Sequence, residues 1–303
     1  MSDLRQKMIE MNLFVSSTFF KDGTSIEEAL TQCEKYDICN VELGSNHKYS
    51  DNFNSIIKPF KFKYLVHNYF PIPQKSFVLN LASSDKEIVE RSIKHVYEAI
   101  DFCEMTGSLL YTFHPGFLSD PKGPNISSNN YDFQWDESVI KLKNSYKNAF
   151  ETMLSSIDKC AKYASQKKVR IAIETEGSFQ KHAHLLMQRP EEFEQLFKYF
   201  KPNDLGINLN IGHLKLAMNY FRFPLNSFLD LIKEYLVAME LSHNNGIEDQ
   251  HLPLIDNEWY WTTIFDPRFK NAYKILEFRD VSIQGIQDNI ILFKKMFYEF
   301  QIS

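Results

Sequence analysis

The chain has 303 residues, of which 44% are hydrophobic and 24% are charged, a composition typical of soluble globular proteins. Its formal net charge of −5 weighs against a general binder of polyanions, although a basic patch on an acidic protein stays compatible with nucleic acid. The four cysteines are scattered without a Cys-x-x-Cys pair, so we expect free thiols in a reducing compartment. No apolar run approaches the length of about 18 residues that a membrane helix needs, and the N-terminus is polar. We therefore expect a cytoplasmic protein without a membrane span.

Short apolar segments bounded by polar residues recur along the whole chain. Segments of this length with branched apolar residues are typical of strands buried on both faces. The predicted strands cover residues 12–16, 40–44, 63–67, 108–114, 169–174, 205–210, 236–241 and 273–277.

Helical patterns separate these strands. Ser25 is a predicted N-cap, with Glu28 at the capping-box position, and Pro190 stands near the first position of another helix. Residues 116–131 are rich in Pro, Gly and Asn and are predicted to form a long loop, which in a compact domain is often functional. Long helices are predicted over residues 85–105, 136–166 and 282–300.

Eight strands that alternate with helices predict an α/β fold, the (β/α)8 TIM barrel, with its loops gathered at the C-terminal face. An open doubly wound sheet is the alternative, but such sheets usually carry a Gly-rich phosphate loop, and the chain has none. We expect one domain over residues 1–303, with residues 1–11 as an N-terminal extension.

Potential metal ligands stand at or just after the ends of several predicted strands. A lone histidine at a strand end is more often a structural residue than a ligand, but a barrel brings all of these positions to one mouth. Imidazoles and carboxylates that converge in this way predict a site for a divalent metal ion such as Zn, Mn, Co or Mg. The residues are His67, His114, Glu174, Asn210, His213, Glu240, His243, Asp249, His251 and Glu277.

Six stretches, taken in order, carry a resemblance to a known family. The order and spacing of these stretches are similar to those of the xylose-isomerase-like barrel superfamily. That superfamily holds sugar isomerases and epimerases and also endonuclease IV, the zinc-dependent abasic-site nuclease. The stretches are residues 67–69, 109–116, 173–175, 208–213, 249–254 and 276–277.

The chain departs from the family pattern at positions that matter. Asn210 stands where the family has Asp, and Glu240 stands where it usually has His. The first change removes one negative charge and the second adds one, which fits either a rearranged metal site or a barrel that has lost its metal. His243 is an alternative to Glu240 as the ligand, since both cannot point inward from a regular strand. After Leu254 the chain also lacks the Gly-Glu-Gly that the family often has.

As an isomerase, epimerase or related dehydratase, the chain would act on a sugar or sugar-derived substrate by removing a proton next to a carbonyl. The resemblance implies that Glu174 and Glu277 are catalytic, and that His243, Arg279 and Glu42 bind the substrate. A homo-oligomer is left open. The implied metal ligands are His67, His114, Glu174, Asn210, His213, Glu240, Asp249, His251 and Glu277.

Two alternatives stay open. The first is an endonuclease IV-like phosphodiesterase that acts on abasic DNA with three zinc ions held by the same nine residues. Asn210 and Glu240 weigh against it, and basic residues are not gathered in the strand-end loops where a DNA backbone would need them. The sequence therefore disfavours nucleic acid as a partner. The second is a non-catalytic barrel without metal.

Overall fold

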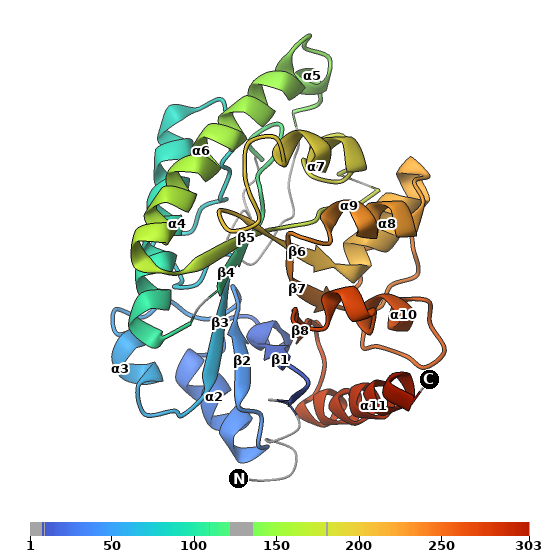
Figure 1. The fold of residues 1–303 in the computed structure, drawn as a ribbon. Helices are drawn as coiled ribbons and strands as arrows, with labels where there is room; N and C mark the ends of the chain where they lie inside the picture. Colours follow the sequence, from blue (N-terminus) through green and yellow to red (C-terminus); the bar gives the residue numbers. More distant parts are fainter. Residues whose placement is uncertain (1–7, 9, 109, 122–135, 180, 303) are drawn as a thin grey trace.

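The computed structural model describes residues 8, 10–108, 110–121, 136–179 and 181–302. Eight parallel strands close into a barrel in the order of the sequence (Figure 1). Each predicted strand is present, and its ends differ by at most two residues from the prediction. The strands are β1 (Leu13–Ser16), β2 (Asn40–Leu43), β3 (Lys63–His67), β4 (Leu110–Phe113), β5 (Arg170–Glu174), β6 (Gly206–Asn210), β7 (Leu236–Leu241) and β8 (Tyr273–Leu276).

Strand β1 closes the barrel because it pairs on both sides. Val15 lies opposite Val41 of β2 and opposite Leu276 of β8, and both pairings are parallel. The predicted (β/α)8 fold is therefore confirmed, and the open doubly wound sheet is excluded.

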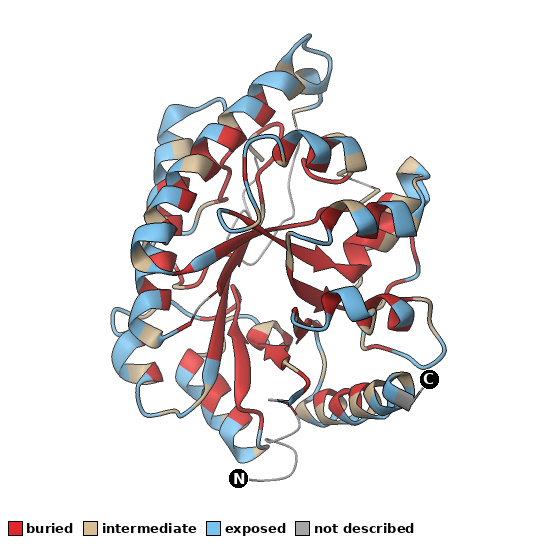
Figure 2. Cartoon of the chain, in the orientation of Figure 1, coloured by how far each residue is buried: buried red, intermediate tan, exposed pale blue. Residues whose placement is uncertain are grey.

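Helices surround the barrel, with buried inner faces and exposed outer faces (Figure 2). The larger ones are α2 (Ile26–Lys35), α4 (Lys86–Thr106), α6 (Ser145–Lys167), α8 (Ile211–Phe221), α9 (Leu225–Ile232) and α11 (Ile283–Ile302). Shorter helices are α3 (Phe53–Ile57), α5 (Glu137–Ile140), α7 (Pro190–Leu196) and α10 (Tyr260–Ile264), with 3-10 turns at Ser17–Phe19 and Pro267–Phe269. None of the helices in the described part of the chain is long and apolar enough to cross a membrane.

The predicted helix starts are confirmed, but one predicted helix is wrong. The Ser25 hydroxyl caps α2 by accepting the Glu28 N–H at 3.2 Å, and Pro190 is the first residue of α7. The helix predicted over residues 136–166 is instead two helices, α5 and α6. The break lies at Asn144, whose φ of 82° is left-handed and incompatible with a continuous α-helix.

The barrel interior changes from apolar to polar toward the C-terminal ends of the strands. Successive side chains of a strand point to opposite faces, so residues two positions apart share the inside. The lower interior layer includes Phe14, Leu65, Leu110, Ala172, Ala238 and Ile275. Two positions further along the same strands stand Ser16, His67, Thr112, Glu174, Glu240 and Glu277, all buried. The upper, polar layer of the interior, called the polar chamber below, therefore lies directly above the apolar layer.

Two predicted segments fall largely outside the described residues. These are residues 1–11, of which the structure describes 8, 10 and 11, and the predicted loop 116–131, which it describes only as far as residue 121. Met8 and Met11 are buried in the main hydrophobic core.

Candidate metal centre

A first group of possible ligands lies where β3, β4 and β5 end. The Nε2 atoms of His67 and His114 lie 3.8 and 3.6 Å from Oε2 of Glu174. These distances are too long for hydrogen bonds, but ligand atoms about 2.1 Å from one tetrahedral ion lie about 3.4 Å apart. Oε2 of Glu174 is buried and has no hydrogen-bond partner among the described residues. The group therefore has the spacing and the unpartnered atom that a divalent ion requires.

The opposite ring nitrogens of these histidines are held by neighbouring groups. Nδ1 of His67 lies 2.9 Å from the Thr112 hydroxyl, and Nδ1 of His114 lies 2.7 Å from Oε1 of Glu176. Metal-ligating histidines are commonly oriented in this way by a second hydrogen bond. Glu176 is a functional candidate that the sequence analysis missed, although it stands two residues after Glu174.

A second group follows the ends of β6 and β7 and adjoins the first, since Nδ1 of His213 lies 3.1 Å from Oε1 of Glu174. Oδ2 of Asp249 lies 3.3 Å from Nε2 of His213 and 3.1 Å from Nε2 of His251. Oδ1 of Asp249 has no hydrogen-bond partner among the described residues. The Thr175 carbonyl lies 2.9 Å from Nδ1 of His213. Glu277 lies 3.1 Å from Nδ1 of His251. Two imidazoles and a carboxylate again fit a divalent ion of the zinc type.

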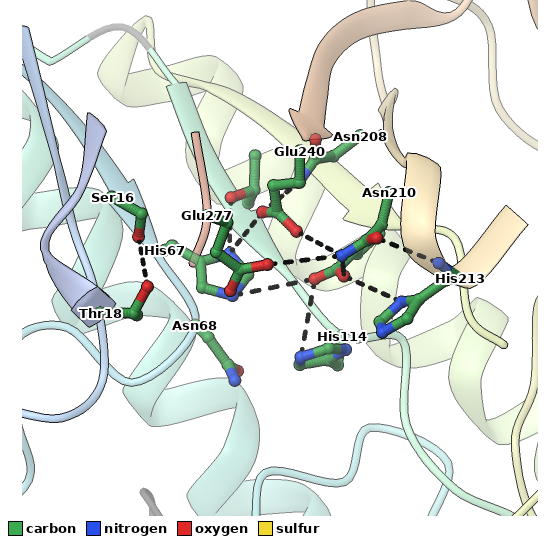
Figure 3. A network of polar contacts seen from close by, with 12 residues as sticks. Ser16, Thr18, His67, Asn68, His114, Asn208, Asn210, His213, Glu240 and Glu277 are labelled. Atoms are coloured by element: carbon green, nitrogen blue, oxygen red, sulfur yellow. Dashed lines mark hydrogen bonds and ion pairs between the residues drawn. The ribbon is translucent and has the colours of Figure 1, made fainter. Parts of the chain in front are cut away.

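Between the two groups, Asn210 faces carboxylates with its amide nitrogen (Figure 3). Its Nδ2 lies 2.9 Å from Oε1 of Glu174, 3.1 Å from Oε2 of Glu240 and 3.5 Å from Oε2 of Glu277. Its Oδ1 accepts the His213 backbone N–H at 3.1 Å and so caps α8. Because the helix cap engages Oδ1, the NH₂ group of Asn210 points at the three carboxylates. A cation would need an oxygen ligand at that position, so Asn210 and the three glutamates do not fit a cation as they are arranged.

Beneath this amide lies a floor of buried acids. Glu240 accepts a 2.6 Å hydrogen bond from Asn208, a residue that the sequence analysis did not single out. Glu42 is fully buried, and neither of its carboxyl oxygens has a hydrogen-bond partner among the described residues. Glu42 and Glu240 form a third group of possible ligands with His67, which also belongs to the first group.

The pKa values of the acids divide into two sets. Burial raises the pKa of Glu42 and of Glu240 well above the usual range, and nearby carboxylates add to the increase. Burial acts in the same direction on Glu174, Glu277 and Asp249, but neighbouring imidazoles outweigh it and lower their pKa values. The floor acids are therefore neutral, whereas the carboxylates of Glu174, Glu277 and Asp249 are ionised when no ion is bound.

The histidines show the complementary pattern. Burial alone would lower the pKa of His114 and of His251, but the adjacent carboxylates raise both pKa values to about 9. The pKa of His213 is also raised, since Asp249 and Glu174 outweigh its burial. Burial lowers the pKa of His67. At neutral pH three protonated imidazoles balance the flanking carboxylates, and a divalent ion would have to displace those protons.

A cavity of about 400 Å³ opens over both groups. Its lining includes Glu174, Glu277 and Arg279. Arg279 is exposed and forms no ion pair with any described residue.

Of the other two predicted substrate-binding residues, neither lines this cavity. Glu42 lies in the buried floor, and His243 faces the Tyr260 ring at 6.1 Å. His243 is three positions from Glu240, an odd spacing, and its backbone pairs with Leu252. The structure therefore brings together all nine predicted ligands and Arg279, and it places Glu240 inside the chamber in preference to His243.

Gly177 positions His213 by allowing a close approach of two backbones. A Cβ atom at residue 177 would lie 2.1 Å from the carbonyl oxygen of His213. We expect Gly177→Ala to lower the free energy of unfolding by about 1–3 kcal/mol, because the backbone of α8 must move. Urea unfolding measures this change. Gly285→Ala is the control, since its new Cβ would meet only side chains and lies in a helix. Equal stabilities of the two variants would contradict the prediction.

Three curated proteins match this chain over part of its length. The apurinic-apyrimidinic endonuclease 1 of Plasmodium berghei (strain Anka) is 28% identical over 206 residues, which are 58% of this chain and 39% of the relative. The chain thus spans well under half of that relative's length.

Solved structures match over the whole fold. A D-tagatose 3-epimerase-like protein has a TM-score of 0.71 at 16% identity, covering 95% of this chain and 98% of the other. Endonuclease IV from Thermus thermophilus has a TM-score of 0.61 at 14% identity, covering 95% and 99%. A family profile for the xylose isomerase-like TIM barrel matches residues 26–295. The chain belongs to the xylose isomerase-like TIM barrel family.

Proposed function

We propose that this protein is a divalent-metal-dependent enzyme that hydrolyses a phosphate ester of a sugar-like alcohol. The observation that carries the proposal is the pair of neighbouring His–His–carboxylate groups, from which His114, Glu174, His213, Asp249 and His251 line one cavity. Zinc-type ions in such groups supply charge that neutralises phosphate oxygens and acidifies water. The partial match to an apurinic-apyrimidinic endonuclease supports the same class of chemistry.

The chain's own residues supply the remaining functions. Glu277 lines the cavity, and His251 lowers its pKa against the effect of burial, so it is available as a carboxylate to accept a proton from water. Arg279 lines the cavity without an ion pair to a described residue, so its guanidinium is available for a phosphate group. Glu176 holds the ring of His114.

The substrate is proposed to be small at the point of reaction. A cavity of about 400 Å³ accepts a monosaccharide with one phosphate, or a single abasic nucleotide turned out of a DNA strand. The net charge of −5 favours a small ester over a nucleic acid. Both remain members of one chemical class, the phosphate esters of sugar-like alcohols.

A sugar isomerase or epimerase is the second candidate, and one observation favours it. Glu174 and Glu277 line the same cavity and both have lowered pKa values, as two carboxylates that exchange a proton with a carbon atom would need. Asn210 weighs against it, because its amide nitrogen occupies the centre of the carboxylate set that includes both residues.

Isotope incorporation distinguishes the two candidates. The zinc-loaded protein is incubated with bis-p-nitrophenyl phosphate, a duplex with one abasic site, and a panel of sugars and sugar phosphates. In water labelled with oxygen-18 we expect label in the phosphate group of the product, which is a monoester from a diester substrate and inorganic phosphate from a sugar phosphate. In deuterium oxide we expect no deuterium on carbon. Deuterium in a sugar without phosphate release would establish the isomerase instead. A metal-loaded protein that is inactive in both assays would contradict both.

A further inference from the structure

The centre of the polar chamber is occupied by a side chain of this protein. The Asn210 nitrogen lies within 3.5 Å of oxygens from three carboxylates, those of Glu174, Glu240 and Glu277. All four side chains are buried, so water does not compete for these contacts. The amide N–H groups therefore stabilise the three converging carboxyl groups in the position where a cation would otherwise do so.

The amide cannot simply turn over to offer its oxygen. Oδ1 of Asn210 accepts one of the free N–H groups in the first turn of α8, that of His213. The backbone N–H of Asn210 is also fixed, at 3.0 Å from the Thr175 hydroxyl. A flipped amide would leave the His213 N–H facing an NH₂ group and lose the helix cap. The central position is thus closed by a hydrogen-bond donor.

The two flanking groups keep the features of cation sites. In each, one carboxylate oxygen faces two imidazole nitrogens, and a buried carboxylate oxygen has no hydrogen-bond partner among the described residues, Oε2 of Glu174 in one and Oδ1 of Asp249 in the other. The group of Glu42, His67 and Glu240 does not add a third site, because it shares His67 with the first.

From this geometry we infer that the protein binds two divalent ions per chain, one in each flanking group, and that the Asn210 amide replaces a third between them. The inference rests on the proposed function only in that the flanking groups bind metal. It has a direct consequence. An aspartate at position 210 would keep the helix cap with one oxygen and present the other to three carboxylates, which creates a site that demands a cation.

The test counts ions. The full-length protein is stripped with a chelator, dialysed against excess Zn²⁺ alone, freed of unbound metal and analysed by mass spectrometry. We expect about two zinc ions per chain in the wild type and about three in Asn210→Asp. We also expect zinc to raise the Tm of Asn210→Asp by more than that of the wild type. Asn210→Ser, which retains a capping oxygen but removes the amide donor, is expected to keep at least the two flanking ions, because the amide is not a ligand.

Several results would overturn the inference. A wild type with three ions or one, or a folded Asn210→Asp with only two, would show that the centre is not closed as described. Loss of an ion from Asn210→Ser would show that the amide is a ligand, and it remains informative even where Asn210→Asp does not fold. One or three ions in an active wild type would overturn this inference alone. No bound ion would overturn the proposed function as well.

Discussion

Replacement of Glu174 by glutamine is expected to abolish turnover while leaving the barrel folded. One oxygen of Glu174 contacts Asn210 and His213, at 2.9 and 3.1 Å, and the other faces His67 and His114. Glutamine has almost the same shape, but it loses the charge and places an NH₂ group against a ring of donors. We expect kcat to fall by about 10³-fold or more, because the charge and the ligand are lost together.

The measurement is kcat on the substrate that the isotope assays identify, together with the zinc content and the far-ultraviolet circular dichroism of the variant. Glu151→Gln is a matched control, since Glu151 is exposed and pairs with Lys147 one turn earlier in α6. It is expected to retain wild-type activity. Full activity in a folded Glu174→Gln protein would exclude Glu174 from the reaction.

The sequence predicted the barrel because the signals for a buried strand are local. Each strand is a short branched apolar run. The strand period of two also implies that Glu240 and His243 cannot both point inward, but only the structure shows that Glu240 is the one inside. The helix break at Asn144 was missed because the surrounding pattern is helical. Its signal is the asparagine itself, which adopts left-handed backbone conformations more readily than most residues.

The candidate site was predicted as a list of residues but not as an arrangement. The sequence indicates Asn210 as a ligand, since an amide has an oxygen to offer. The orientation of that amide is set by the His213 N–H, which lies in the first turn of α8 and needs an acceptor. The residue type alone reveals neither where α8 starts nor that this N–H needs Asn210. Glu176 and Asn208 were missed for a related reason. They act through His114 and Glu240, and such indirect contacts exist only in three dimensions.

Removal of the metal is expected to make stability fall as pH rises above 6.5. Without ions, His114 and His251 have pKa values of about 9, above the ordinary 6.5, because carboxylates outweigh burial. A histidine with a raised pKa stabilises the fold fully below its unfolded pKa, and this contribution is lost as pH rises through the folded pKa. Each of these increases in pKa corresponds to roughly 3 kcal/mol, lost between about pH 6.5 and about pH 9.5.

The zinc-loaded protein should not show this decrease, because its histidines are neutral ligands and have no proton to lose. We therefore expect the Tm of the chelator-treated protein to decrease from about pH 6.5 to about pH 9.5 and that of the zinc-loaded protein to stay level, so that the difference grows with pH. His114→Gln should reduce the decrease in the metal-free protein. A metal-free Tm that rises across this interval would contradict the prediction. It would mean that protons do not hold the flanking carboxylates together when the metal is gone.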